Sequence, residues 1–287
     1  FAHAFFVFFQ FFVFYLIMRI ETFNRLPDDT PLTLDIPIVF GVTHEAGMLG
    51  QKVYFNQGEE PTFARVSIVD EDTRFPKEFN FNKNEYLQMV IPFYRRVKDL
   101  AGNDFHVIFP QWYRAPQGVA LYIRGFQEFS LDLYVNESLA RRILRYATDA
   151  AKAFALWRQD FTGEPMDKCD LFNDDIPLMS PDMYRKFFFE YEKELGDFYG
   201  GIYYWHSCGD TTSHISAVHA LPNIDLFDFG VTMEDKMEGL KGLTREQTVE
   251  FRIMAQKHIQ QCSEEESKEY VRKIIESCKE YSVPSYI

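Results

Sequence analysis

Cysteine is scarce in this chain. Only four cysteines occur among the 287 residues, and no two of them have the spacing of a CxxC pair. A small secreted domain held together by disulfides needs a denser cysteine framework than this one. The cysteine usage therefore favours a reducing compartment, and we expect a cytoplasmic protein.

Basic side chains are few relative to acidic ones. The sequence has 30 lysines and arginines against 43 acids, which gives a formal net charge of −13 at pH 7. Binding to the phosphates of a nucleic acid needs a basic stripe. The densest basic cluster, Arg141, Arg142 and Arg145, falls on the solvated face of an expected helix. Nucleic acid is therefore excluded as the main partner.

Internal repeats and low-complexity linkers are absent, so nothing divides the chain into several domains. Its 287 residues are enough for one β/α barrel, which typically needs about 250. We expect an apolar segment over residues 1–20 and a single domain over residues 21–287.

Polar residues are rare in the first segment, FAHAFFVFFQFFVFYLIMRI, which holds His3, Gln10 and Arg19. A basic start and a small-residue cleavage site, the marks of a signal peptide, are missing. About 18 apolar residues lie at the lower limit for a transmembrane helix. We expect an apolar N-terminal helix packed against the barrel. The alternatives are membrane contact by residues 1–20, which would make the protein membrane-associated, and a junction within a longer chain.

Short apolar runs alternate with stretches of helical periodicity along the rest of the chain. This alternation is typical of a parallel sheet covered by helices, and it favours an α/β fold of the (β/α)8 TIM-barrel type. A doubly wound open sheet is the alternative, but no GxGxxG follows the first strand. The expected strands lie within residues 35–47, 105–112, 168–174, 200–209 and 224–230, and the expected helices span residues 86–100, 136–160, 180–199, 213–220 and 263–281.

Polar side chains collect where the expected strands end. In a β/α barrel the carboxyl ends of the strands form the active-site face. We therefore expect one polar site built from several strand ends, with these candidate residues: His44, Glu45, Asp174, Asp175, His206, Cys208 and Asp228.

His206 and Cys208 have the spacing of two side chains on the same side of an extended segment. An imidazole nitrogen and a thiolate sulfur are both ligands of zinc, and a catalytic zinc keeps one position open for substrate. Two ligands are too few, so a third must come from elsewhere in the chain. The alternative is a hydrogen-bonded core histidine beside a small buried cysteine.

Asp174 and Asp175 are adjacent acids at a strand end. They are suited to binding a cation, orienting a cationic ligand or acting as a general base. Capping and solvation of a loop explain such a pair equally well.

Several segments are similar to the uroporphyrinogen decarboxylase (URO-D) superfamily. HSCGDTTSHISAVHALPNIDLFDFG resembles the superfamily pattern HxCG(N/D)(T/S)T, and CDLFNDDIPLMSPDMYRKFFFEYEKEL resembles its LSPEMYREF stretch. APQGVALYIRGFQEFSLDLYVNESLARRILRYATDAAKAFA resembles a third stretch that contains RG and DLYENPEL. The matches run from about Phe23 to Gly230, and the superfamily fold is a β/α barrel.

The HxCG motif is more narrowly similar to the cobamide-dependent methyltransferase branch, where its His and Cys ligate zinc. The resemblance implies zinc at His206 and Cys208. The third ligand of that branch is usually a cysteine in a late Gly-rich loop, which this sequence lacks. Cys262 is the cysteine in the corresponding order. The alternatives are an acid such as Glu45 or Asp175, or no third ligand at all. The resemblance further implies catalytic Asp174 and Asp175, and substrate binding by His44, Glu45, Tyr122, Arg124 and Asp228.

The resemblance leaves two chemistries open. The decarboxylases of the superfamily carry an early (W/R)xMRQAGR stretch that is missing here. The leading expectation is therefore a zinc-dependent methyltransferase that moves a methyl group between a corrinoid (methylcobamide) protein and a thiol or tetrahydrofolate acceptor. The alternatives are a metal-free decarboxylase and a non-catalytic member that binds a corrinoid or tetrapyrrole. A homodimer is also left open.

Overall fold

The computed structural model describes residues 17–25, 33–56, 60–64, 66–230, 240–241, 243, 247–251 and 260–286. Most of the expected apolar N-terminal helix lies outside these ranges, and residues 17–25 form a helix. None of the helices in the described ranges combines the length and the apolar character that crossing a membrane requires.

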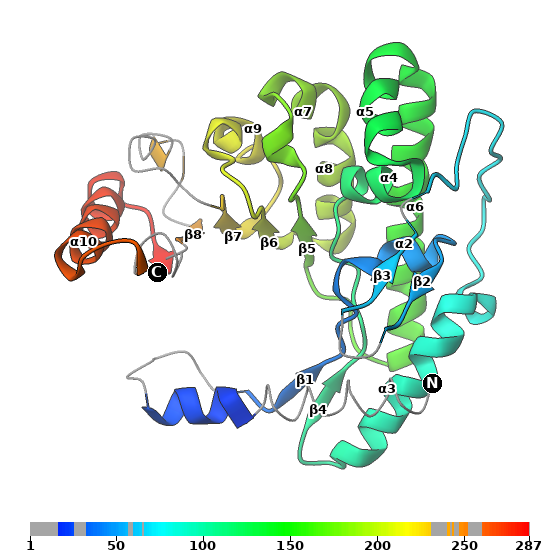
Figure 1. Cartoon of the computed structure of the whole chain (residues 1–287), viewed down its shortest axis with the longest axis horizontal. Coiled ribbons are helices and arrows are strands. Elements are labelled where there is room, and N and C mark those ends of the chain that lie inside the picture. The colour runs from blue at the N-terminus through cyan, green and yellow to red at the C-terminus, as the bar shows by residue number, and fades with distance from the viewer. Residues whose placement is uncertain are drawn as a thin grey trace.

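Two parallel sheets form the scaffold of the chain (Figure 1). In the first, β1 (Asp35–Pro37) pairs with β4 (His106–Ile108). The second has five strands in sequence order: β5 (Cys169–Phe172), β6 (Ile202–His206), β7 (Ile224–Asp228), β8 (Thr248–Glu250) and β9 (Ser285–Tyr286). A short antiparallel pair, β2 (Val53–Tyr54) and β3 (Thr62–Phe63), stands apart from both sheets.

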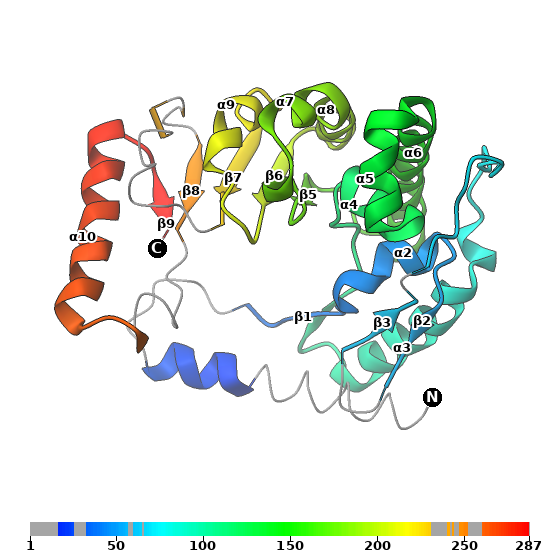
Figure 2. The ribbon, with the colours of Figure 1, turned by 45° about the horizontal axis from the view of Figure 1, so that its top comes forward.

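The helices cover the outer side of the arc that the strands follow (Figure 2). The α-helices are α2 (His44–Met48), α3 (Glu85–Ala101), α4 (Pro116–Arg124), α5 (Phe126–Val135), α6 (Glu137–Thr162), α7 (Pro181–Phe187), α8 (Phe189–Tyr199), α9 (Ile215–Val218) and α10 (Glu264–Tyr281). Single 3-10 turns occur at η1 (Gly41–Thr43), η2 (Phe81–Lys83), η3 (Ile176–Leu178) and η4 (Thr212–His214).

The starts of three long helical segments follow from their capping residues. The Asn136 side chain accepts a hydrogen bond from the Leu139 backbone N–H at the start of α6. Ser180 caps α7 in the same way, and Ser263 forms a capping box with Glu266 at the start of α10. Each bond satisfies a backbone donor that the first helical turn leaves without a partner. The expected starts of these helices are therefore confirmed.

The chain that follows β4 joins the two sheets. The Phe172 backbone N–H donates to the Tyr113 carbonyl at 2.8 Å, and the Ala115 N–H donates to the Phe172 carbonyl at 3.2 Å. Arg114 lies between them, in a parallel bridge with Phe172. Within the described ranges no strand pairing connects β9 to β1. The expected barrel is thus confirmed as a barrel-like α/β arrangement, whereas closure into eight strands is not seen there.

Two expected elements differ from the structure. The expected strand within residues 35–47 ends at Pro37, and the chain enters η1 and α2, which place His44 and Glu45 on a helix. The expected helix over residues 180–199 is two helices that meet at Phe188, whose φ of −115° departs from the helical value of about −63°. Apolar periodicity continues through the break, so the pattern alone does not reveal it.

Candidate metal centre

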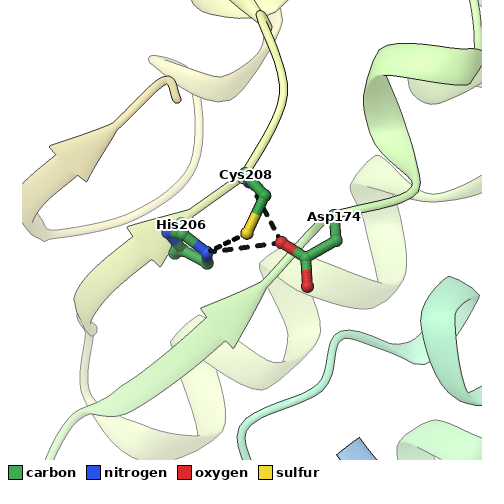
Figure 3. Close-up of side chains that lie close together, drawn as sticks. All are labelled: Asp174, His206 and Cys208. Carbon is green, nitrogen blue, oxygen red and sulfur yellow. Dashed lines mark hydrogen bonds and ion pairs between the residues drawn. The ribbon is translucent and has the colours of Figure 1, made fainter. Parts of the chain in front are cut away.

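Three metal-ligating side chains converge at the ends of β5 and β6 (Figure 3). Asp174 follows β5, His206 ends β6 and Cys208 lies two residues further on. Their ligand atoms all lie within 4.8 Å of one another, and no other group of three such residues occurs in the part of the chain that the structure describes. Adjacent parallel strands deliver these side chains because their carboxyl ends lie at the same edge of the sheet.

The distances from His206 to the other two groups match the coordination shell of zinc. His206 Nε2 lies 3.3 Å from Cys208 Sγ and 3.3 Å from Asp174 Oδ1. Ligand atoms around a tetrahedral zinc with ordinary bond lengths lie roughly 3.3–3.6 Å apart. The two separations from His206 therefore already suit one bound ion, and all three ligand atoms lie within 4.8 Å of one another.

His206 is held from behind by a fully buried carboxylate. Asp228, at the end of β7, accepts a hydrogen bond from His206 Nδ1 at 2.6 Å. The same carboxylate accepts bonds from the Tyr204 hydroxyl at 2.8 Å and from the Gly230 backbone N–H at 2.8 Å. With the proton on Nδ1, the Nε2 lone pair points at the other two ligands. A carboxylate in this position is the usual support of a metal-binding histidine.

The surroundings of Asp174 favour its ionised form, which is the form that binds a metal. Burial raises the pKa of Asp174, but bonds from His206 and Cys208, together with the Arg114 guanidinium, outweigh burial and leave the pKa below its usual value. The Cys208 backbone N–H donates to Asp174 Oδ1 at 3.0 Å. The carboxylate is thus both charged and fixed in orientation.

Arg114 links the two adjacent acids. Its guanidinium lies 3.2 Å from Asp174 Oδ2 and 3.3 Å from Asp175 Oδ2, and its side chain is only 5% exposed. Burial raises the pKa of Asp175, and Arg114 lowers it in part. The guanidinium also lies over the Tyr122 ring, 4.6 Å from its centroid. Arg114 therefore holds the turn after β5 through two ion pairs and one cation–π contact.

Gly118 leaves the space that Arg114 occupies. A Cβ at position 118 would meet Cγ and Cδ of Arg114 at 2.7 and 2.9 Å. We expect Gly118→Ala to displace Arg114 and to destabilise the protein by about 1 kcal/mol, the usual cost of overpacking, although alanine favours a helix interior. Denaturant titration measures this change.

The control for Gly118→Ala is the same substitution in a protein that already carries Arg114→Met. The two changes should be non-additive, because residues in contact share their interaction free energy. Equal effects of Gly118→Ala with and without the guanidinium would contradict the contact as the cause.

The remaining expected site residues have contacts within the protein. Glu45 Oε1 accepts bonds from the Tyr113 and Arg114 backbone N–H groups at 2.8 and 3.0 Å, and so positions the chain that carries Arg114. Arg124 pairs with Asp132 at 2.7 Å and connects α4 to α5. Their contact with a substrate stays a prediction.

His44 and Cys262 lie outside the group of three. His44 is buried against Tyr86 and Phe154, and burial lowers its pKa to about 3, so its imidazole is neutral. Cys262 lies just before α10. The side chain that completes the group with His206 and Cys208 is Asp174. We expected it as a catalytic residue, within an acidic pair that is also suited to binding a cation.

The inner face of β5 carries a carboxylate of a different kind. Asp170 is in register with Tyr204 of β6, and no hydrogen bond or ion pair is seen at its side chain among the described residues. Burial raises the pKa of Asp170 to about 7. This group is therefore partly protonated at neutral pH, unlike Asp174.

Comparison with known protein families shows to which family this chain belongs. The sequence profile of the uroporphyrinogen decarboxylase (URO-D) family matches residues 33–279. The chain belongs to the URO-D family. The resemblance noted from the HxCG motif is thereby confirmed, and the metal-ligating group lies well inside the matched range.

A solved structure supports the fold of this URO-D family member. The chain is similar to a methyltransferase from Methanosarcina mazei, with a TM-score of 0.61, 13% identity, and coverage of 88% of this chain and 73% of that one. At this identity the likeness concerns the fold. No curated protein matches the chain in sequence.

Sequence reasoning missed Arg114 in this URO-D family member. The residue follows β4 in an irregular stretch, and nothing nearby marks it as different from other basic residues. The available signal is the spacing of Arg114, Gly118 and Tyr122, which places a small residue and an aromatic ring along one face of α4.

Proposed function

We propose that this chain is a metal-dependent methyltransferase whose zinc is held by Asp174, His206 and Cys208. The observation that carries the proposal is the convergence of one oxygen, one nitrogen and one sulfur ligand at ligand spacing. The URO-D family match and the fold likeness to a methyltransferase support the same reading.

The charges around the group suit a divalent cation. An ionised Asp174 and a Cys208 thiolate beside a neutral His206 contribute two negative charges, which one Zn²⁺ neutralises. Arg114 is balanced by its second partner, Asp175. The donor set therefore fits zinc without leaving an uncompensated charge at the site.

The exposure of the three residues fits a catalytic site. His206 is buried, Asp174 is partly buried and Cys208 is exposed, so the group is open on the cysteine side. Structural zinc sites use four protein ligands, whereas catalytic sites use three and keep a position for substrate. Three ligands with one accessible side favour the catalytic type.

The chain's own residues keep the site in the form that a substrate needs. Zinc bound there would lower the pKa of a substrate thiol and hold it as a thiolate nucleophile. Asp228 fixes the His206 tautomer, and Tyr204 holds the same Asp228 oxygen. Arg114 and the Cys208 N–H together hold the Asp174 carboxylate. The metal-ligating side chains are thus oriented before the ion or a substrate binds.

The proposed methyl donor is a corrinoid protein, and the proposed acceptor is a thiol or tetrahydrofolate. A porphyrinogen substrate fits less well, because its many carboxylates need several available cations. Among the described residues near the group, Arg114 is engaged by two aspartates, and Arg124 is engaged by Asp132. The acidic strand ends would repel such a substrate.

Metal analysis combined with a methyl-transfer assay tests the proposal. We expect about one zinc per purified chain and consumption of methylcobalamin when a small thiol is the acceptor. Chelation should abolish the transfer, and added zinc should restore it, because the thiolate depends on the ion. Elemental analysis and the cobalamin spectrum provide the two measurements.

The opposite outcome is equally clear. Turnover of uroporphyrinogen by metal-free protein, with no use of methylcobalamin, would replace the methyltransferase with a decarboxylase. Zinc content well below one per chain, with transfer intact after chelation, would remove the metal from the proposal.

A further inference from the structure

A fully buried carboxylate lies behind the sheet that carries the metal-ligating group. Glu192 of α8 is 0% exposed and accepts three hydrogen bonds. Gln117 donates to Oε1 at 2.7 Å, whereas the Tyr184 hydroxyl and the Trp205 indole N–H donate to Oε2 at 2.8 and 3.0 Å. Helix α8 packs on β5, so Glu192 approaches the strand ends from the helix layer (Figure 1).

Two residues of this network directly precede proposed metal ligands. Trp205 precedes His206 in β6, and Asn173 precedes Asp174 after β5. Asn173 contacts this network through its side-chain amide. With the amide nitrogen toward Glu192, Asn173 donates to Glu192 Oε1 at 3.0 Å and its oxygen accepts from the Trp205 indole at 2.9 Å. In the opposite orientation, Asn173 Oδ1 accepts from Gln117 Nε2. Glu192 is therefore connected, directly or through Gln117, to the chain immediately before each of these ligands.

Asn173 also joins the two strand ends to each other. Its backbone N–H donates to the His206 carbonyl at 2.7 Å. The side chain of Asn173 reaches the helix layer while its backbone holds the residue that carries the imidazole. Asn173 therefore connects Glu192 to the backbone of His206, and it directly precedes Asp174.

A carboxylate is energetically unfavourable at this position. Burying an ionised group in the helix layer is unfavourable, and an apolar side chain of the same size would avoid the cost. Burial raises the pKa of Glu192 to about 7, with the three donors partly offsetting that effect. What only a carboxylate provides here is two oxygens that accept from several donors at once.

We propose that Glu192 is a positioning residue for the metal centre, and that it sets the separation of Asp174 and His206 through Asn173 and Trp205. This inference rests on the proposed metal site. The hydrogen bonds of Glu192 go to Gln117, Tyr184 and Trp205, so the proposed role is to position the ligands rather than to bind the ion or the substrate. The role of Glu192 is to lock the two strand ends at ligand distance, so that the ion meets a preformed site.

Cobalt binding to Glu192→Gln tests the inference. The substitution keeps the shape of the side chain but removes one acceptor oxygen. We expect Co²⁺ affinity to fall by about tenfold or more, the usual effect of losing a group that orients a ligand. The d–d absorption of bound cobalt should also change, because it reports ligand geometry. A loss of stability alone would not alter that spectrum.

Glu194→Gln is the matched control on the same helix. Glu194 forms ion pairs with Arg145 and Lys152 and has no contact with the Glu192 network among the described residues. We expect this variant to bind cobalt with unchanged affinity and spectrum. Circular dichroism confirms that each variant is folded under the titration conditions.

A second pair of variants keeps the test decisive if Glu192→Gln does not fold. Trp205→Phe and Tyr184→Phe each remove one donor to the same Glu192 oxygen. Only Trp205 adjoins a ligand, so only Trp205→Phe should weaken cobalt binding and alter its spectrum. Equal effects of the two substitutions on cobalt would overturn the inference.

The outcomes separate the two proposals. Unchanged cobalt affinity and spectrum in folded Glu192→Gln overturn the positioning role and leave the metal site intact. Absence of cobalt binding by the unmodified protein overturns the metal site, and the role of Glu192 with it.

Discussion

Cys208→Ser is expected to lower zinc affinity by more than about 100-fold, since losing a group that only orients a ligand already costs about 10–100-fold. A serine hydroxyl stays protonated near neutral pH and is a poor zinc ligand, whereas a thiolate is among the best. Cys208 is exposed, so the substitution should leave folding intact. Competition with a chromogenic chelator measures the affinity, and methyl transfer should be lost with the metal.

Cys262→Ser is the matched control and also tests the alternative third ligand. Cys262 is partly buried and lies outside the group formed by Asp174, His206 and Cys208. We expect it to bind zinc like the unmodified protein. Comparable losses in both cysteine variants would mean that Cys262 completes the site. Full zinc affinity in Cys208→Ser would exclude the thiolate as a ligand.

Arg114→Met should destabilise the metal-free protein by about 3 kcal/mol, the lower end of the cost of breaking a buried ion pair. The substitution leaves Asp174 and Asp175 side by side without the cation that lies between them. Bound zinc would neutralise Asp174 in place of the guanidinium. We therefore expect a smaller loss in the presence of zinc, measured by denaturant titration with and without the ion.

Arg124→Met provides the comparison for this effect. Its partner Asp132 is less exposed than Asp174 and Asp175. The pair connects α4 to α5 and has no part in the group of three. Zinc should leave the loss of stability caused by Arg124→Met unchanged. If zinc reduces the loss of stability in neither variant, Asp174 does not ligate the ion.

The strand ends were predictable because parallel sheets impose a simple rule. Polar residues that follow apolar runs meet at one edge, and the sequence places His206, Cys208, Asp174 and Asp228 in that position. The same-side geometry of an i, i+2 pair in an extended segment accounts for His206 and Cys208. These four residues lie together in the structure.

The third member of the group was not predictable to the residue. Asp174 and Asp175 are chemically identical neighbours, and the turn after β5 decides which one faces His206. The order of residues in the chain favoured Cys262 as the third ligand. That order is a poor guide, because it says little about which residues lie close together in a barrel. The burial of Glu192 was not predictable either, since an acid within a helix usually faces solvent. Glu192 is nevertheless fully buried in α8.

Glu192 and Asp170 also change how the folded chain exchanges protons with its surroundings. Burial raises the pKa of both carboxyls to about 7, whereas in an unfolded chain glutamate and aspartate titrate near about 4.3 and 3.9. Between these values the folded state binds more protons than the unfolded state. Their contribution to stability is therefore greatest at acidic pH and declines as the pH rises toward 7.

The same two groups make the net charge of the native protein less negative. With their pKa values raised to about 7, both carboxyls bind protons near neutral pH in the folded chain. The charge that they contribute is then less negative than the formal count of −13 assumes. Folding thus removes part of the acid excess as it compacts the chain, and so reduces the self-repulsion that the remaining charges exert.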